Sequence, residues 1–389
     1  MQKCFCLASV CLLVFLSGCW DIEEAERMDY IHGIAVDYQD GKVLVTLQIV
    51  NLGNLGQAET GGGSGANENQ AVVAREMSDS VNDAIFKIYK SSQRRLFWGH
   101  LTFIVITKDA LKQGLLKEIL DLFDRYRETK YRILLFATED ETVDKIFEAT
   151  AIFDGSPVYT RLTDLSNTYV QNSFIYELPM REFFLQIHEP GYNAIIPAIT
   201  TTQKTWTSAE AIETMVESVG VALLDSKRRY LGFITGDDVN GLRWLTKNTI
   251  RSNIQAKNDN GDPVAEGVVV EPKISIKPKV RNGEVIFNIE IKGKVVINEF
   301  IKDMELDEVK KKFQEQIEKE VYHTYQKALE YQADIYRLSE VLYRKDVKTW
   351  KKINKNGQVP LHENSIKVAA KLTLTSSKLD DHHPIMQTK

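Results

Sequence analysis

The chain has 389 residues, of which 43% are hydrophobic and 26% charged, and its formal net charge is −5. This is the composition of a globular protein with a sizeable core, and the acidic balance gives no support to a nucleic-acid-binding surface, which normally shows a clustered basic excess. The four cysteines are Cys4, Cys6, Cys11 and Cys19. Because no cysteine follows Cys19, a disulfide framework, a cysteine-based zinc site and a cysteine nucleophile are excluded from the body of the chain.

Residues 1–18 have the organisation of a secretory signal peptide. Lys3 supplies a positive charge, residues 6–16 are apolar, and the small residues Ser17 and Gly18 follow. An apolar run of this length is too short to cross the ~30 Å hydrocarbon core of a bilayer as a helix. The alternative interpretation is a short uncleaved anchor or a buried helix of the fold.

The tetrapeptide Leu16-Ser17-Gly18-Cys19 resembles the bacterial lipobox. In lipoproteins of this kind the cysteine thiol receives a diacylglyceryl group, and cleavage before the cysteine, here between Gly18 and Cys19, makes it the new N-terminus. Two acyl chains suit stable anchoring, whereas a single chain binds a membrane only marginally. We therefore expect Cys19 to be the membrane tether, with residues 20–389 outside the cytoplasmic membrane.

The first half of the body predicts alternating strands and helices. We expect a β-hairpin with an Asp40-Gly41 turn, a Gly-rich surface loop over 51–70, and a helix over 71–93 with apolar residues at helical spacing. Short buried strands over 100–107 and 131–139 then alternate with helices over 115–128 and 142–149. This order predicts a mixed or parallel sheet covered by helices. Residues 153–207 have weak periodicity and several prolines.

A second unit begins near residue 217. It reads as strand, turn and strand, followed by a helix that begins near Asp237 and carries Trp244 as a core residue. Two long alternating strands over 268–280 and 285–291 form a hairpin across Asn282-Gly283, and a last strand over 365–377 precedes a polar tail, 378–389.

One long helix is expected over 306–331. Its apolar residues recur every four positions, at Val309, Phe313, Ile317, Val321 and Tyr325. Such a stripe is typical of a helix packed on a sheet, with a coiled-coil dimer as the alternative. Together these elements predict an α+β fold with mixed sheets, divided into an N-terminal region, 19–205, which comprises two subdomains, and a C-terminal domain, 206–377.

No arrangement of catalytic or metal-binding residues emerges from the sequence. The seven histidines include no pair at the i, i+4 spacing of a metalloprotease helix, and the Gly-x-Ser-x-Gly nucleophile motif is absent. His100 precedes a buried strand and fits a structural role. The adjacent carboxylates Asp237 and Asp238 fit a helix start, and the His382-His383 pair lies in the polar tail. We therefore predict no catalytic residue, no metal and no cofactor.

Several stretches resemble the Ger(x)C family of spore-germination lipoproteins. They are LSGCWDIEEAERMDYIHGIAVD near the start, RRLFWGHLTFIVITKDAL at 94–111, ESVGVALLDSKRRYLGFITGDDVNGLRWL at 217–245, ISIKPKVRNGEVIFNIEIKGKVVINE at 274–299, and QKALEYQADIYRLSEVLYRKDVKTWKK at 326–352. The ordered series covers nearly all of the mature chain. Where the family usually continues Ala-Asp-Ile-Phe-Gly-Phe-Gly, this chain has Ala-Asp-Ile-Tyr-Arg-Leu-Ser at 333–339, which suggests a divergent member.

The resemblance implies a three-domain mixed α/β protein, lipid-anchored at the outer face of the spore's inner membrane. It implies a non-catalytic subunit of a nutrient germinant receptor, which works with an A-type subunit and a polytopic B-type subunit. Two other classes remain as alternatives: an extracytoplasmic solute-binding lipoprotein, which would need two similar lobes and a hinge, and an anchored hydrolase, for which the catalytic motifs are missing.

Overall fold

The computed structural model describes residues 28–50, 71–126, 128–139, 143–149, 160–163, 166–207, 212–281, 284–302 and 304–375. The described strands and helices are β1 (Met28–Gln39), β2 (Lys42–Val50), β3 (Ala71–Ser78), α3 (Val81–Ser91), β4 (Arg95–Phe97), η2 (Trp98–His100), β5 (Phe103–Thr107), α4 (Lys108–Lys112), α5 (Leu115–Arg125), β6 (Leu134–Thr138), α6 (Val143–Glu148), α7 (Ser166–Gln171), α8 (Met180–Ile187), β7 (Ile195–Thr202), β8 (Met215–Leu224), β9 (Tyr230–Thr235), η4 (Gly236–Val239), α9 (Leu242–Leu245), β10 (Arg251–Lys257), β11 (Pro263–Arg281), β12 (Glu284–Phe300), α10 (Leu306–Glu330), α11 (Leu338–Lys345), α12 (Val347–Ile353), η5 (Glu363–Ser365) and β13 (Ile366–Thr375).

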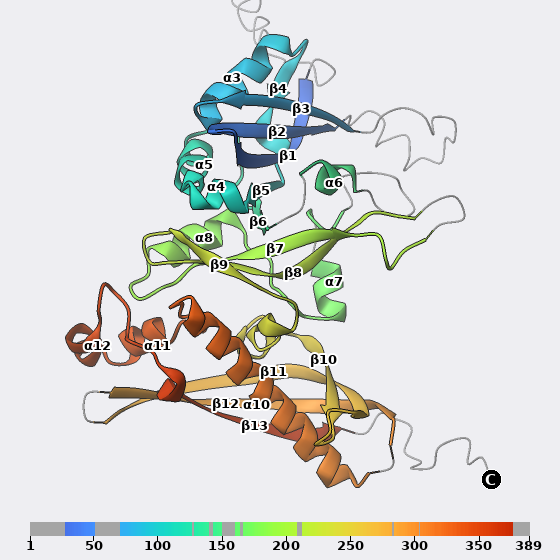
Figure 1. Cartoon of the computed structure of the whole chain (residues 1–389), viewed down its shortest axis with the longest axis vertical. Coiled ribbons are helices and arrows are strands. Elements are labelled where there is room, and N and C mark those ends of the chain that lie inside the picture. The colour runs from blue at the N-terminus through green and yellow to red at the C-terminus, as the bar shows by residue number, and fades with distance from the viewer. Residues whose placement is uncertain are drawn as a thin grey trace, which may run out of the picture.

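These strands form two sheets that follow one another along the long axis of the molecule (Figure 1). The first has the order β3-β2-β1-β5-β6-β7-β8-β9, with β4 paired to β1, and the second has the order β10-β11-β12-β13. Both sheets mix parallel and antiparallel neighbours, which confirms the predicted α+β class with mixed sheets.

The first sheet is buried on both faces because alternate residues of its central strands point to opposite sides. Ile104 and Ile106 of β5 belong to a core with α3, α5 and α8. Phe103 and Val105 of the same strand face a second core with α6. The predicted hairpin over β1 and β2 is confirmed, and its turn residues Asp40 and Gly41 both have positive φ, as a tight two-residue hairpin turn requires.

Two features of the first sheet differ from the sequence predictions. Residues 71–78 of the predicted helix are strand β3, which pairs with β2 over its whole length; the helix begins only at Val81, after the N-cap Ser80. The first sheet also continues through β8 and β9, so the predicted boundary at 205/206 falls between two hydrogen-bonded strands of one sheet. The division into domains stays a prediction.

The second sheet carries the long helix α10 across one face (Figure 1). The five apolar residues of the predicted stripe are at most 1% exposed, and they pack with residues of β10, β11, β12 and β13, so the sheet-packed helix is confirmed. The predicted hairpin is the pair β11–β12, although its turn, Asn282-Gly283, lies outside the described residues. The predicted last strand is β13.

Side chains of α10 bond to the free edge of the second sheet. The backbone N–H groups of Val368, Ala370 and Leu372 in β13 donate to side chains of α10: Val368 to the Tyr322 hydroxyl at 3.2 Å, Ala370 to Glu318 at 2.9 Å and Leu372 to Gln314 at 3.1 Å. The three acceptors are spaced four residues apart on the helix, and the three donors two apart on the strand. The helix therefore covers the edge of the strand as well as the face of the sheet.

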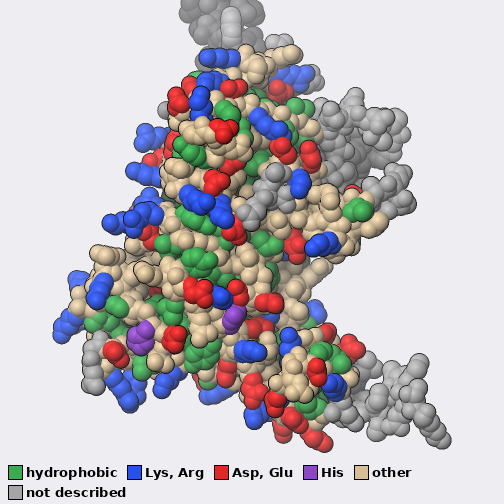
Figure 2. All heavy atoms as spheres, viewed as in Figure 1, with side chains coloured by type: hydrophobic (Ala, Val, Ile, Leu, Met, Phe, Trp, Pro, Cys, Tyr) green, Lys and Arg blue, Asp and Glu red, His purple; other side chains and the backbone are tan. Residues whose placement is uncertain are grey.

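Charged side chains are scattered over the visible surface, and those of Lys and Arg recur along the left outline in Figure 2. No helix within the described residues has the length and apolar character to span a membrane.

Candidate functional site

The predicted site residues Gly18 and Cys19 lie outside the described residues, so lipidation stays a prediction. The histidine pair of the tail also lies outside them. Within the described part of the chain, no group of three or more His, Cys, Asp or Glu residues is placed to hold a metal ion.

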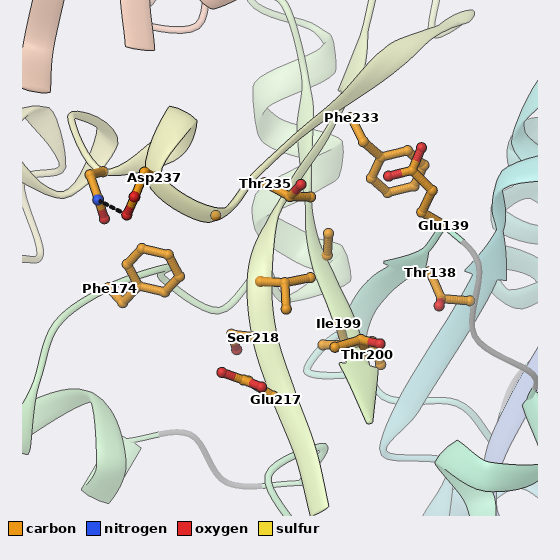
Figure 3. Close-up of a pocket in the computed structure, with 14 residues that line it drawn as sticks. Thr138, Glu139, Phe174, Ile199, Thr200, Glu217, Ser218, Phe233, Thr235 and Asp237 are labelled. Atoms are coloured by element: carbon orange, nitrogen blue, oxygen red, sulfur yellow. Dashed lines mark hydrogen bonds between the residues drawn. The ribbon is translucent and has the colours of Figure 1, made fainter. Parts of the chain in front are cut away.

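A crevice opens where two neighbouring strands of the first sheet share the fewest paired residues. Strands β6 and β7 are paired through Ala137 and Ala198 alone. Beyond this pair the carboxyl ends of the two strands border a cavity of about 460 Å³ (Figure 3). The cavity is lined by Thr138 at the end of β6 and Glu139 after it, by residues 198–200 of β7 and 217–219 of β8, by Phe174, and by Phe233, Thr235, Gly236, Asp237 and Asn240 around the end of β9.

A β-bulge shapes the wall formed by β7 and β8. Ala198 pairs with Gly220, whereas its neighbour Ile199 pairs with Ser218, so Val219 is an extra residue without a partner in β7. A bulge of this kind turns side chains that would otherwise alternate between the two faces of the strand. As a result, three consecutive residues of β8, 217–219, line the cavity.

Hydrogen-bond acceptors and aromatic rings dominate the lining. The Glu139 carboxylate accepts from Lys108 Nζ at 2.9 Å, Asp237 accepts from Asn240 Nδ2 at 3.1 Å, and Glu217 is exposed. Thr138 is 1% exposed, and its hydroxyl oxygen has no hydrogen-bond partner among the described residues, although a buried polar atom normally has one. The cavity is thus equipped to bind a small polar group.

The same lining lacks the nucleophile–histidine pair of many hydrolases. The described residues that line the cavity include three carboxylates, Glu139, Glu217 and Asp237, and no histidine, cysteine or lysine. A Ser–His or Cys–His pair needs a nucleophile within hydrogen-bond reach of a base whose pKa lies near the working pH. The crevice does not provide such a pair from its described lining.

A second cluster joins the end of the first sheet to the chain after α10. Asn193, 3% exposed, donates from Nδ2 to the carbonyl of Leu224 at 3.0 Å. Its Oδ1 accepts from the backbone N–H of Asp334 at 3.2 Å. The Asp334 carboxylate is buried and accepts from the N–H groups of Leu338 and Ser339 at 2.9 and 2.7 Å. Burial raises the pKa of this carboxyl to about 6, against the opposing effect of those hydrogen bonds.

The residue that replaces the family glycine lies in this cluster. Arg337 has φ +58°, in the left-handed region that favours glycine. Its guanidinium lies 4.5 Å from the centre of the Tyr192 ring and donates from Nε to Glu340 at 2.5 Å. The side chain therefore links α11 to the segment before β7, which a glycine could not do.

A buried ion pair fixes α9 against α10. Glu320 Oε2 accepts from Arg243 at 3.0 Å and from Trp244 Nε1 at 2.6 Å. Trp244 is fully buried, as predicted. At the start of this segment, Asp237 and Asp238 lie in the single turn η4, at the predicted helix start. His323 Nε2 of α10 lies 2.5 Å from Asp238 Oδ1.

His100 is exposed at the end of η2, and its structural role stays a prediction. It lies edge-on to Tyr30, with ring centres 5.1 Å apart, and partial burial lowers its pKa.

Sequence reasoning missed the crevice. Its residues come from strands that are far apart in the chain, and Val219 reaches the cavity through a bulge that the alternating pattern does not reveal. One signal was available: Thr138-Glu139 follows a buried strand directly, at the edge of the sheet where parallel strands usually place functional groups.

The described residues form a two-sheet α+β protein with a crevice between strands β6 and β7 of the first sheet. Comparison with known proteins gives the family. The sequence model of the "Spore germination protein N-terminal domain" matches residues 21–201, and that of "Spore germination B3/ GerAC like, C-terminal" matches residues 219–378. The chain belongs to the Ger(x)C family of spore germination proteins.

Relatives and a solved structure agree with this assignment. The chain is 25% identical to spore germination protein KC of Bacillus subtilis (strain 168) over 90% of its own length and 89% of the relative's. It is 24% identical to spore germination protein B3 of the same organism, over 74% and 72%. A crystal structure of the GerBC protein has a similar fold, with a TM-score of 0.51 and 16% identity, over 92% of this chain and 99% of that one.

Proposed function

We propose that this protein is a non-catalytic, lipid-anchored subunit of a nutrient germinant receptor, held at the outer face of the spore's inner membrane by a diacylglyceryl group on Cys19. Membership of the germination family, matched along nearly the whole chain, is the observation that carries the proposal. The lipobox-like Leu16-Ser17-Gly18-Cys19 supports the anchor.

The protein would act by binding A- and B-type receptor subunits. Similarity to proteins named KC, B3 and A3 supports a place in the same receptor system. A crevice without a nucleophile–base pair is consistent with a role in binding. The contacts of Asn193, which is buried, and Arg337, which is half-buried, connect the segment before β7 to the chain after α10.

The test is a Cys19→Ala variant in spores, with Cys11→Ala as the matched control because Cys11 lies inside the predicted signal peptide. We expect Cys19→Ala to lose lipid processing and to weaken the nutrient response, while Cys11→Ala behaves like the wild type. Membrane fractionation, mass spectrometry of the N-terminal peptide and the drop in optical density after nutrient addition measure these outcomes. Normal processing of Cys19→Ala would refute the anchor. Full germination by a released protein, in a strain without paralogues, would refute the receptor role.

The second candidate function is binding of a solute, which the crevice favours. Solute-binding proteins of the usual kind have two similar lobes, whereas the two sheets here differ in strand number and order. Calorimetric titration of the mature chain with nutrients separates the two functions. Micromolar binding that Thr138→Val weakens at least tenfold would favour the solute-binding function, and absence of binding would favour the subunit function alone.

A further inference from the structure

One end of the second sheet carries a group of cations without acidic partners. We call it the basic face: Lys277, Lys279 and Arg281 at the end of β11, Lys348, Lys351 and Lys352 on α12, and Lys355 just after that helix. All seven are exposed, and none forms an ion pair with a described carboxylate. Most other described lysines and arginines of this domain with short contacts to a carboxylate lie on α10 or on β12–β13.

The two parts of the basic face are held side by side. Lys345, at the end of α11, donates from Nζ to the carbonyl of Ile276 in β11 at 2.5 Å. Helix α12 follows directly and packs on α11 through Tyr343 and Trp350, whose ring centres are 5.0 Å apart. In Figure 1, α12 and this end of β11 lie together at the lower left. Helix α12 and the end of β11 are therefore held beside each other on an ordered scaffold.

The basic face is positive although the chain as a whole is acidic. The whole chain has a net charge of −5, so an unpaired group of seven cations is not a consequence of composition. Two carboxylates flank these sequence segments, Asp346 and Glu284. Asp346 caps α12 by accepting from the N–H of Thr349 at 3.0 Å. Even with both counted, the cations exceed the carboxylates by five.

Apolar side chains are exposed among the cations. Val280 is 43% exposed and Val347 is 40% exposed. Lysine-rich surfaces with exposed apolar side chains suit the interface of an anionic bilayer, where the ammonium groups meet phosphates and the apolar groups enter the headgroup region. Arginine, the usual choice for bidentate pairing with a defined carboxylate or phosphate, supplies one cation of the seven.

We infer that the basic face binds the anionic headgroups of the membrane surface, so that the protein lies with its α12 flank against the bilayer. The orientation rests on the anchor in the proposed function; the lipid affinity does not. Met28 pairs with Arg95 at the α3–β4 end of the molecule. Met28 follows Cys19 by nine residues, and nine residues span at most about 32 Å. In Figure 2 the left outline, from α3 to α12, carries Lys and Arg side chains, so contact along this flank would bring both ends to one surface.

The test uses the mature chain 20–389 without lipid, which contains every described residue, so the proposed anchor plays no part. Vesicles of phosphatidylcholine with about 30 mole per cent of the anionic lipid phosphatidylglycerol are compared with pure phosphatidylcholine vesicles by cosedimentation. We expect binding to the anionic vesicles alone, and weaker binding as salt is raised.

The decisive comparison is between two triple variants. The first carries Lys348→Glu, Lys351→Glu and Lys352→Glu, and its affinity for anionic vesicles should fall roughly a hundredfold. The control reverses three exposed, unpaired lysines elsewhere in the same domain, Lys257→Glu, Lys294→Glu and Lys319→Glu, and should keep most of the affinity.

Three results would overturn the inference. The first is equal binding of the wild type to neutral and anionic vesicles, and the second is an equal loss of affinity in both triple variants. The third is absence of vesicle binding by the wild type, which would direct the search to an acidic protein partner. Unchanged circular dichroism and urea midpoints show that each variant is folded. Failure of the anchor would be seen only in the Cys19→Ala experiment.

Discussion

Glu320 should be one of the most sensitive residues for the stability of the C-terminal domain. Its carboxylate holds Arg243 and the indole N–H of Trp244 in a place where the Arg and Glu side chains are 8% and 12% exposed. Glu320→Ala leaves a buried cation without its partner, which costs about 3–5 kcal/mol, and an unsatisfied indole N–H, which costs about 1–3 kcal/mol. Because such costs are not additive, we expect a loss of about 4 kcal/mol in the free energy of unfolding.

Urea unfolding followed by near-ultraviolet circular dichroism measures this loss. With a slope of about 3 kcal/mol per molar urea, the midpoint should fall by roughly 1.3 M. The matched control is Glu315→Ala on the same helix. Its carboxylate is 46% exposed and pairs with Lys312 at 3.4 Å, so the expected cost is below about 1 kcal/mol.

A double variant separates the unpaired charge from the lost packing. Arg243→Met with Glu320→Leu replaces the ion pair by apolar side chains of similar volume and should recover all but about 1–2 kcal/mol, the cost left by the indole N–H. The reasoning is refuted if Glu320→Ala costs less than about 1 kcal/mol, or if the double variant is no more stable than the single one.

Three further changes test the contacts around α9, α10 and α11. Arg337→Gly should be more stable than Arg337→Ala by about 1 kcal/mol in urea, since both lose the side-chain contacts but only alanine keeps the left-handed backbone cost; equal stabilities would contradict this. Burial raises the pKa of Asp334 from 3.8 to about 6, so its contribution to stability is complete below about pH 4 and is lost as the pH rises through 6, by about 3 kcal/mol. Relative to Asp334→Asn, the wild type should therefore lose stability between pH 4 and 7, and a relative gain would disprove the assignment. Gly241→Ala should lower the melting temperature, because a Cβ there would lie 2.4 Å from the backbone carbonyl oxygen of Glu320; an unchanged melting temperature would show that α9 moves freely away from α10.

Local patterns predicted most of the elements because their apolar periodicity and turn residues agree with the final packing. Strand β3 is the informative exception. Val73 and Met77 are four residues apart, a spacing that places two residues on one face of a helix and also on one face of a strand. Pairing with β2 decided between the two, and that pairing depends on a neighbour which the local pattern does not contain.

Long-range arrangement was harder to predict. The strands β8 and β9 read as the start of a new unit, yet they complete the first sheet beside β7. Strand β10 was not predicted at all; within its seven residues, Ile254 and Ala256 alternate with polar positions too briefly to stand out. The crevice depends on a single residue pair between β6 and β7. The apolar periodicity of the two strands does not indicate how many of their residues pair.

The bonds between α10 and β13 limit how the second sheet can move. Four residues of helix advance about 6 Å and two residues of strand about 6.6 Å, so the acceptors on the helix and the donors on the strand stay in step for three bonds, over two repeats. A slide of 1 or 2 Å would break all three bonds at once, and the next matching position is a full repeat away. Helix and sheet should therefore move as one rigid body, with any hinge located at the junction with the first sheet.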